Sequence, residues 1–91
     1  MQELQTYRNQ IDEIDTEIIE LFAKRLEVVK KVGEYKKIHN IPTLQPARWQ
    51  EILEKIKKNA GKFGIEEYFI ENIWNEIHKE SLKLENKIFS K

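Results

Sequence analysis

One arginine interrupts a long apolar stripe near the start of the chain. The stripe takes every third or fourth residue from Leu4 to His39, positions that share one face of a helix. Nearly all of these positions are apolar, yet Arg25 stands in the middle. Burying a guanidinium costs free energy unless an anion lies close enough to compensate its charge. Arg25 therefore indicates either an ion pair within the protein or a site for an acidic ligand.

Two further cations extend this pattern. Lys36 follows Arg25 by about three helical turns, so both side chains project to nearly the same side, roughly 16 Å apart along the axis. At that spacing they could hold opposite ends of a small dianion. Arg8 precedes Arg25 by roughly 25 Å and is rotated by about a quarter turn. Arg8 cannot serve the site of its own chain, but it could serve the equivalent site of a partner chain.

The later part of the chain offers three more polar candidates. Arg48 lies near the expected start of a helix, where a cation opposes the helix dipole, and this favours a ligand role. Ser81 interrupts an apolar row, and Glu85 stands one turn beyond it. Together with the first three cations, these residues predict a small cavity lined by positive charge. Such a cavity suits a compact dicarboxylate and could stabilise charge separation within it.

Each candidate also has a plainer interpretation. Arg25 could pair with Asp15 or with a carboxylate on the last helix, as buried arginines usually do. Lys36 and Glu85 could be solvated surface charges, and Ser81 a small residue at a tight helix crossing. The sequence has no visible nucleophile–base pair, no glycine-rich phosphate loop and no metal-ligand pair. The two histidines, His39 and His78, are better explained as ordinary interface residues.

Three helices must position these side chains. The first is expected from Leu4 to His39, where Gly33 weakens the interior without ending the helix and Pro42 prevents its continuation. The second is expected from Pro46 to Ala60 and the third from Ile65 to Phe89, separated by a turn that two glycines bracket. There are no strand signals. The sequence predicts an all-α fold of long, short and medium helices in a single domain, residues 1–91.

The first helix is too long for a globule of 91 residues. It would span about 54 Å, whereas a compact chain of this length has a radius of gyration of about 12 Å. Its apolar face therefore needs a second chain, and we predict a homodimer.

Composition narrows the class of protein. Sixteen basic and sixteen acidic residues cancel, so nothing indicates attraction to nucleic acid or to a membrane surface. Cysteine is absent, and no signal peptide or long apolar run is visible. We expect a soluble, cytoplasmic protein.

The spacing of these residues resembles that of the all-helical chorismate mutases over essentially the whole chain. The matching segments are Arg8-x-x-Ile11-Asp12-x-Ile14-Asp15, Ile19-x-Leu21-x-x-x-Arg25, Val32-Gly33-x-x-Lys36, Ile41-Pro42-x-x-x-x-x-Arg48 and Ile77-His78-x-Glu80-Ser81. The resemblance implies an intertwined homodimer in which the first helix of each chain completes the site of the other. It also implies the rearrangement of chorismate to prephenate, on the branch towards phenylalanine and tyrosine, which needs no nucleophile, cofactor or metal.

The resemblance assigns roles by position. Arg25 and Arg8 of the partner subunit would bind the substrate carboxylates, with Ser81 and Arg48 in support. Lys36 would donate to the ether oxygen of the breaking bond. Glu85 stands where many relatives have a glutamine as second donor, and a carboxyl group donates only when protonated. A preference for acidic pH is therefore expected, with Lys36, Glu85 and Arg25 as the catalytic residues.

Two positions depart from the common pattern. Many relatives have an aspartate where this chain has Gln45, and an Arg-Glu pair where it has Arg48-Trp49. Gln45 could supply part of the contact to the substrate hydroxyl. This combination resembles a branch often fused to DAHP synthase, the first enzyme of the shikimate pathway, which is therefore a possible partner.

Three alternatives stay open from the sequence. The same fold could remove pyruvate from isochorismate. It could be a non-catalytic or regulatory module that docks to DAHP synthase. It could also be a plain helical dimerisation domain in which Arg25 is satisfied internally.

Overall fold

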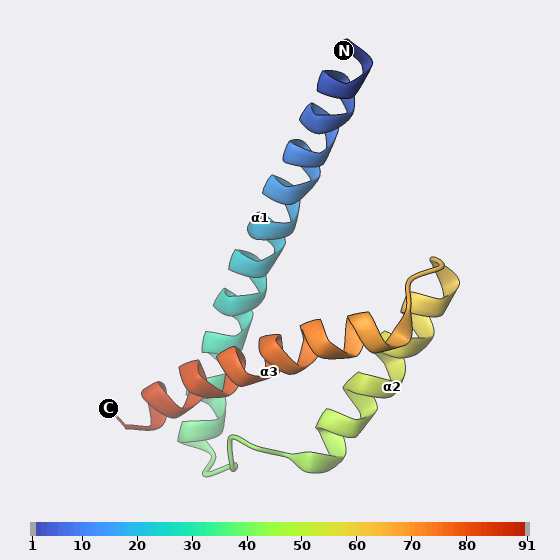
Figure 1. Cartoon of the computed structure of the whole chain (residues 1–91). Coiled ribbons are helices and arrows are strands. Elements are labelled where there is room, and N and C mark those ends of the chain that lie inside the picture. The colour runs from blue at the N-terminus through green and yellow to red at the C-terminus, as the bar shows by residue number, and fades with distance from the viewer. Residues whose placement is uncertain (1, 91) are drawn as a thin grey trace.

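The computed structural model describes residues 2–90, which form three helices and no strand: α1 (Gln2–Ile38), α2 (Pro46–Lys62) and α3 (Glu67–Phe89). Figure 1 shows α3 crossing the C-terminal half of α1, while the N-terminal half of α1 extends away from the other helices. Within residues 2–90, α3 packs against both other helices, and α1 and α2 do not pack against each other. The predicted all-α fold with long, short and medium helices is confirmed.

α1 ends in a Schellman motif. Asn40 takes the left-handed conformation with φ 55°, and the Ile41 N–H donates to the Lys36 carbonyl at 2.8 Å. Pro42 follows directly and cannot continue the helix. The helix ends at Ile38, one residue before the predicted His39.

The turn between α2 and α3 is a second Schellman motif. Gly64 has φ +70°, and the Ile65 N–H donates to the Ala60 carbonyl at 2.8 Å. α2 therefore continues through Gly61 to Lys62, so the predicted end at Ala60 is wrong by two residues. The predicted start of α3 at Ile65 is wrong as well. The Ile65 N–H closes the end of α2, and the next helix begins at Glu67.

The single chain encloses very little apolar surface. Among residues 2–90, Leu53 and Ala60 are the buried apolar side chains. The radius of gyration is 16.7 Å and the long dimension 57 Å, against a radius of about 12 Å for a compact globule of this length. The apolar stripe of α1 lies in solvent, with exposed residues that include Leu4, Tyr7, Ile11, Ile14, Ile18, Leu21, Val28, Val32 and Tyr35. This chain alone does not cover the face that the sequence marks as interior.

None of the helices in residues 2–90 combines the length and the hydropathy that a membrane span requires.

Candidate active site

Gly33 sets the distance between α1 and α3 at their crossing. It is the buried residue of α1, and a Cβ atom at this position would lie 3.0 Å from Ile88 Cδ1 and 3.4 Å from Glu85 Cα. The missing side chain therefore lets the two helices approach closely. That approach brings Ser81 and Glu85 of α3 opposite Arg25 and Lys36 of α1.

Arg25 is held by a serine and not by a carboxylate. Its Nη1 donates to Ser81 Oγ at 2.7 Å, and Ser81 Oγ donates in turn to the Ile77 carbonyl at 2.9 Å. The ion pairs of residues 2–90 do not include Arg25, so the internal ion pair considered from the sequence is not formed there. Burial lowers the pKa of the Arg25 guanidinium, although arginine stays protonated in proteins. A partly buried cation held in this way is ready to accept an anionic ligand.

Lys36 and Glu85 form a buried ion pair. Lys36 Nζ lies 2.8 Å from Glu85 Oε1 and donates to the Thr43 carbonyl at 2.8 Å. The side chains of Lys36 and Glu85 are only 14% and 8% exposed, so the interpretation of both as solvated surface charges is wrong. Glu85 Oε1 is buried and accepts no hydrogen bond, so the contact with Lys36 is a short ion pair without hydrogen-bond geometry.

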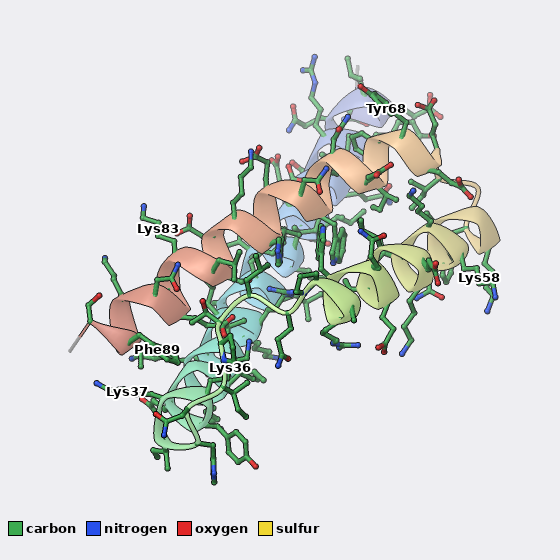
Figure 2. All side chains as sticks on the ribbon, turned by 90° about the horizontal axis from the view of Figure 1, so that it is seen from below. Lys36, Lys37, Lys58, Tyr68, Lys83 and Phe89 are labelled. Carbon is green, nitrogen blue, oxygen red and sulfur yellow. The ribbon has the colours of Figure 1, made fainter. Side chains whose placement is uncertain are left out.

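The neighbouring residue Lys37 does not belong to the site. Figure 2 places Lys36 beside the segment that connects α1 to α2, whereas Lys37 lies towards the C-terminal end of α3. Lys37 Nζ donates to the Ile88 carbonyl at 3.1 Å, close to the end of α3. One position along α1 thus separates a cation of the site from a cation that ties two helices together.

A cavity of about 190 Å³ gathers most of the predicted residues, with walls from all three helices and the α1–α2 segment. Its predicted polar residues are Arg25, Lys36, Gln45, Arg48, Ser81 and Glu85. The side chain of Arg48 is largely exposed and pairs with that of Glu51, also largely exposed, at 3.3 Å. One chain therefore brings together six of the seven predicted site residues.

Arg8 is the predicted residue that its own chain does not bring to the cavity. It is exposed on the N-terminal half of α1, which Figure 1 shows extending away from α2 and α3. It is not among the residues that line the cavity. This placement agrees with the expectation that Arg8 cannot serve its own site.

The sequence did not reveal three contributors to the cavity. Thr43 orients Lys36 through its backbone carbonyl oxygen. Every residue has such an oxygen, so the residue type at position 43 could not have predicted this contact. Trp49 of α2 stacks on His78 of α3 with ring centroids 3.9 Å apart and planes 11° apart. Both rings line the cavity. Helical spacing could have placed His78 beside Ser81 on α3, but not against Trp49.

His78 is neutral near neutral pH. Burial lowers its pKa, and the charges of Arg25 and Lys36 act in the same direction. The nearby Glu85 opposes them and raises the pKa, but it does not reverse the shift.

A second cavity, of about 230 Å³, shares Arg25 and Ser81 with the first. Its remaining lining residues are the apolar Phe22, Leu26 and Ile77 and the acidic Glu76 and Glu80. The groups that could bind a dianion and donate to it lie in the first cavity, which is therefore the candidate active site.

The family model described as chorismate mutase type II matches residues 7–86. The chain belongs to the type II chorismate mutase family. The matched segment includes every predicted site residue, from Arg8 to Glu85. The family therefore accounts for both the helical fold and the part of the chain that builds the cavity.

Similar chorismate mutase family sequences come from several organisms. The T-protein of Haemophilus influenzae is 39% identical over 96% of this chain, which spans 23% of that protein. The chorismate mutase of Methanocaldococcus jannaschii is 34% identical over 74% of this chain and 68% of its own length. The 4-amino-4-deoxychorismate mutase of Streptomyces venezuelae is 26% identical over 98% of this chain and 86% of its own length. The chain spans less than a quarter of the length of the T-protein.

Proposed function

We propose that this chain catalyses the rearrangement of chorismate to prephenate. The observation that carries the proposal is the arrangement of Arg25 and Lys36 around one small cavity in a chain of this family. Arg25 is partly buried and hydrogen-bonded to Ser81, which leaves its charge for an acidic ligand. Lys36 lines the same cavity, and its side chain is largely buried. Two separated cations match a substrate that carries two carboxylates.

The proposed mechanism uses charge and conformation and no covalent step with the protein. In this reaction the ether carbon–oxygen bond breaks while a carbon–carbon bond forms within the same molecule, so no electron leaves the substrate. Arg25 and Arg8 of the partner subunit would bind the carboxylates and hold the compact, reactive conformer. Lys36 would stabilise the negative charge that grows on the ether oxygen. Preorganised donors of this kind act on the transition state more than on the ground state.

The substrate-free contacts of Lys36 leave room for this role. An ammonium group has three N–H donors. One is directed at the Thr43 carbonyl and Glu85 Oε1 lies against the group, so one donor direction stays available for a ligand. The contacts with Thr43 and Glu85 also fix the position of Nζ before the substrate enters. A donor that is already in position stabilises the transition state more than a mobile donor does. Glu85, in its protonated form, would be the second donor to the same oxygen.

A homodimer is part of the proposal. Specific ligand sites usually enclose about 300–1,000 Å³, whereas the cavity of one chain holds about 190 Å³. The apolar stripe on the N-terminal half of α1 is exposed, and Arg8 lies on the same half of this helix. Packing that stripe against a second copy would cover apolar surface and bring Arg8 of the partner subunit to the cavity.

The direct test is the loss of chorismate ultraviolet absorbance with the purified chain, followed by identification of the product. Prephenate would support the proposal, and pyruvate would point to the lyase reaction instead. Lys36→Ala should lower kcat by about 10²–10³, the usual loss for one preorganised donor. Lys37→Ala is the matched control, because Lys37 lies next to Lys36 but bonds the end of α3. Near-normal turnover in Lys36→Ala would reject its assigned role.

A second candidate substrate is 4-amino-4-deoxychorismate. The Streptomyces venezuelae relative that is named for this substrate matches nearly the whole of this chain and most of its own length. The two substrates differ in one ring group, a hydroxyl in the first and an amino group in the second. Both would use the same dicarboxylate-binding cations.

Association with DAHP synthase is a separate proposal. It rests on the resemblance of Gln45 and Arg48-Trp49 to the branch often fused to that enzyme. Turnover measured with and without added DAHP synthase tests it. A rise in kcat/KM with the added enzyme would support the association, and an unchanged value together with no co-migration on a sizing column would reject it.

A further inference from the structure

The segment that connects α1 to α2 carries one of the two groups that hold the Lys36 ammonium. The Thr43 carbonyl accepts a hydrogen bond from Lys36 Nζ at 2.8 Å, and Glu85 Oε1 lies 2.8 Å from the same atom. Glu85 belongs to a regular helix, α3, whereas Thr43 lies in a connection without helical structure. Figure 2 shows Lys36 beside this connection. The position of Nζ therefore depends on what holds Thr43 in place.

The backbone of the connecting segment does not hold Thr43. At its start, the Ile41 N–H donates to the Lys36 carbonyl, and at its end the Gln45 carbonyl accepts from the first turn of α2. Within the described chain, residues 42–44 take part in no backbone–backbone hydrogen bond. Side-chain contacts must therefore fix the backbone between these two ends.

A side-chain hydrogen bond ties Thr43 to α3. The Thr43 hydroxyl donates to Asn86 Oδ1 at 2.8 Å. Asn86 directly follows Glu85, so the acceptor for Thr43 and the counter-ion of Lys36 are neighbours on one helix. The hydroxyl and the carbonyl belong to the same residue, so holding the first restricts the second. The contacts form a closed ring within one chain, made by Lys36, Thr43, Asn86 and Glu85.

We propose that Thr43 and Asn86 are positioning residues for Lys36. Their hydrogen bond keeps the Thr43 carbonyl where it directs Lys36 Nζ, so the ammonium is in place when negative charge grows on the ether oxygen. This role rests on the proposed function, in which Lys36 is the donor to that oxygen. Neither Thr43 nor Asn86 has to touch the substrate with its side chain.

Thr43→Val keeps the shape of the side chain and removes its hydroxyl. It should lower kcat for chorismate about 5- to 20-fold, a part of the roughly 100-fold loss that a misplacement of about 1 Å can cause. KM should change by less than about twofold, because the interaction that is lost acts on the transition state. Asn86→Ala removes the acceptor and should cause the same loss. Thr43→Ser keeps the hydroxyl and should retain most of the wild-type kcat.

Double variants test whether the effect passes through Lys36. If Thr43 and Asn86 act through one hydrogen bond, Thr43→Val combined with Asn86→Ala should be no slower than either single variant. In a Lys36→Ala background, Thr43→Val should cause no further loss, because the donor that it positions is missing. Lys37→Ala is the matched control. It removes another contact between the end of α1 and α3, to the Ile88 carbonyl, and should leave kcat unchanged.

The variants are expected to fold. The hydrogen bond between Thr43 and Asn86 is exposed, so water replaces it and the net loss of stability is small. Alanine is also a better helix former than asparagine at position 86. The midpoints of urea unfolding should therefore stay close to that of the wild type.

A second measurement needs no turnover. The proton NMR signal of a lysine ammonium is observed only while hydrogen bonds slow the exchange of its protons with water. The Lys36 signal should be visible in the wild type and in Thr43→Ser, and it should broaden or disappear in Thr43→Val.

The outcomes separate the positioning role from the proposed function. A wild-type chain without chorismate turnover would reject the proposed function, and the ammonium signal would still decide whether Thr43 holds Lys36. Wild-type kcat in Thr43→Val, or an unchanged ammonium signal, would overturn the positioning role. A loss that recurs in full in the Lys36→Ala background, or that Thr43→Ser shares, would overturn it as well, because the hydroxyl would then not act through Lys36.

Discussion

At the residue scale, Glu85 is the most unusual member of the candidate active site. It is a buried carboxylate whose Oε1 atom contacts Lys36 yet accepts no hydrogen bond. Such a group can assist a developing negative charge only by donating a hydrogen bond from an O–H, and a carboxylate has no O–H until it is protonated. Glu85 is the counter-ion of Lys36 in the structure, and its proposed role as a second donor would require the protonated form.

The first prediction concerns the pH dependence of turnover. Glu85→Gln carries an N–H donor at every pH, whereas a carboxyl group at this position donates only when it is protonated. We therefore expect kcat of Glu85→Gln to vary less with pH than wild-type kcat between mildly basic and mildly acidic pH. Chorismate turnover measured across a pH series with both proteins provides the test. Two profiles of the same shape would show that Glu85 is not the donor.

The second prediction concerns stability and His78. Because burial lowers the pKa of this imidazole, the unfolded chain takes up a proton at higher pH than the folded chain. The contribution of His78 to folding is therefore present above the usual histidine pKa of about 6.5. It is lost as the pH falls below that value towards the folded-state pKa.

His78→Phe keeps an aromatic ring for Trp49 but removes the titration, so its free energy of unfolding should decline less between neutral and mildly acidic pH. Urea unfolding at a fixed protein concentration measures the difference between the two proteins. His39→Gln, a change at the other histidine, is the control. A wild-type decline no steeper than that of His78→Phe would contradict the prediction.

At the element scale, the crossing of α1 and α3 at Gly33 fixes the geometry of the cavity. Helical propensity alone would favour alanine at this position by about 1 kcal/mol. The structure shows why glycine stands there, since an added Cβ would meet Ile88 Cδ1 at 3.0 Å and Glu85 Cγ at 3.3 Å. The crossing therefore requires a residue that the helix itself disfavours.

Gly33→Ala should separate the two helices slightly and move Glu85 relative to Lys36. We expect a net destabilisation of up to about 2 kcal/mol, the overpacking cost less the gain in helix propensity, together with a lower kcat. Gly61→Ala is the control, because a Cβ there meets nothing within 4 Å and should stabilise α2 by about 0.5–1 kcal/mol. Urea unfolding and chorismate turnover measure the two effects. A Gly33→Ala protein as stable and as active as wild type would show that the crossing tolerates a side chain.

For the molecule as a whole, the extended shape and the exposed apolar stripe of α1 raise the question of what covers this stripe. Residues 2–90 have a radius of gyration of 16.7 Å and only two buried apolar side chains, Leu53 and Ala60, so one chain cannot derive much stability from its own core. A symmetric dimer would resolve this, because the same stripe on each copy would be covered by the other.

Mixing two inactive variants tests both the dimer and the role of Arg8. Arg8→Ala and Lys36→Ala should each be a dimer with little activity. When the two are unfolded together and refolded, about half of the dimers should be mixed, and one of the two sites in each mixed dimer regains a full set of residues. The mixture should recover about a quarter of wild-type turnover. No recovery, from a mixture that sedimentation shows to be dimeric, would reject the sharing of Arg8 across the interface.

Local patterns along the chain predict the helices and the kinds of side chain at the site. The apolar spacing predicted three helices, Pro42 and Pro46 marked their ends, and the motif from Arg8 to Ser81 indicated the family. The length of α1 predicted that one chain cannot cover its own apolar face. These features are local or periodic along the chain, so they can be read without knowing how the helices pack.

Which polar groups contact one another depends on how the helices pack. Whether Arg25 would face a carboxylate or Ser81, and whether Lys36 and Glu85 would be solvated or paired, depends on the distance and register of α1 and α3 at Gly33. The stack of Trp49 on His78 likewise depends on how α2 lies against α3. These are contacts between residues far apart in sequence. Periodicity fixes the face on which each side chain lies, but only the packing of one helix against another fixes its partner.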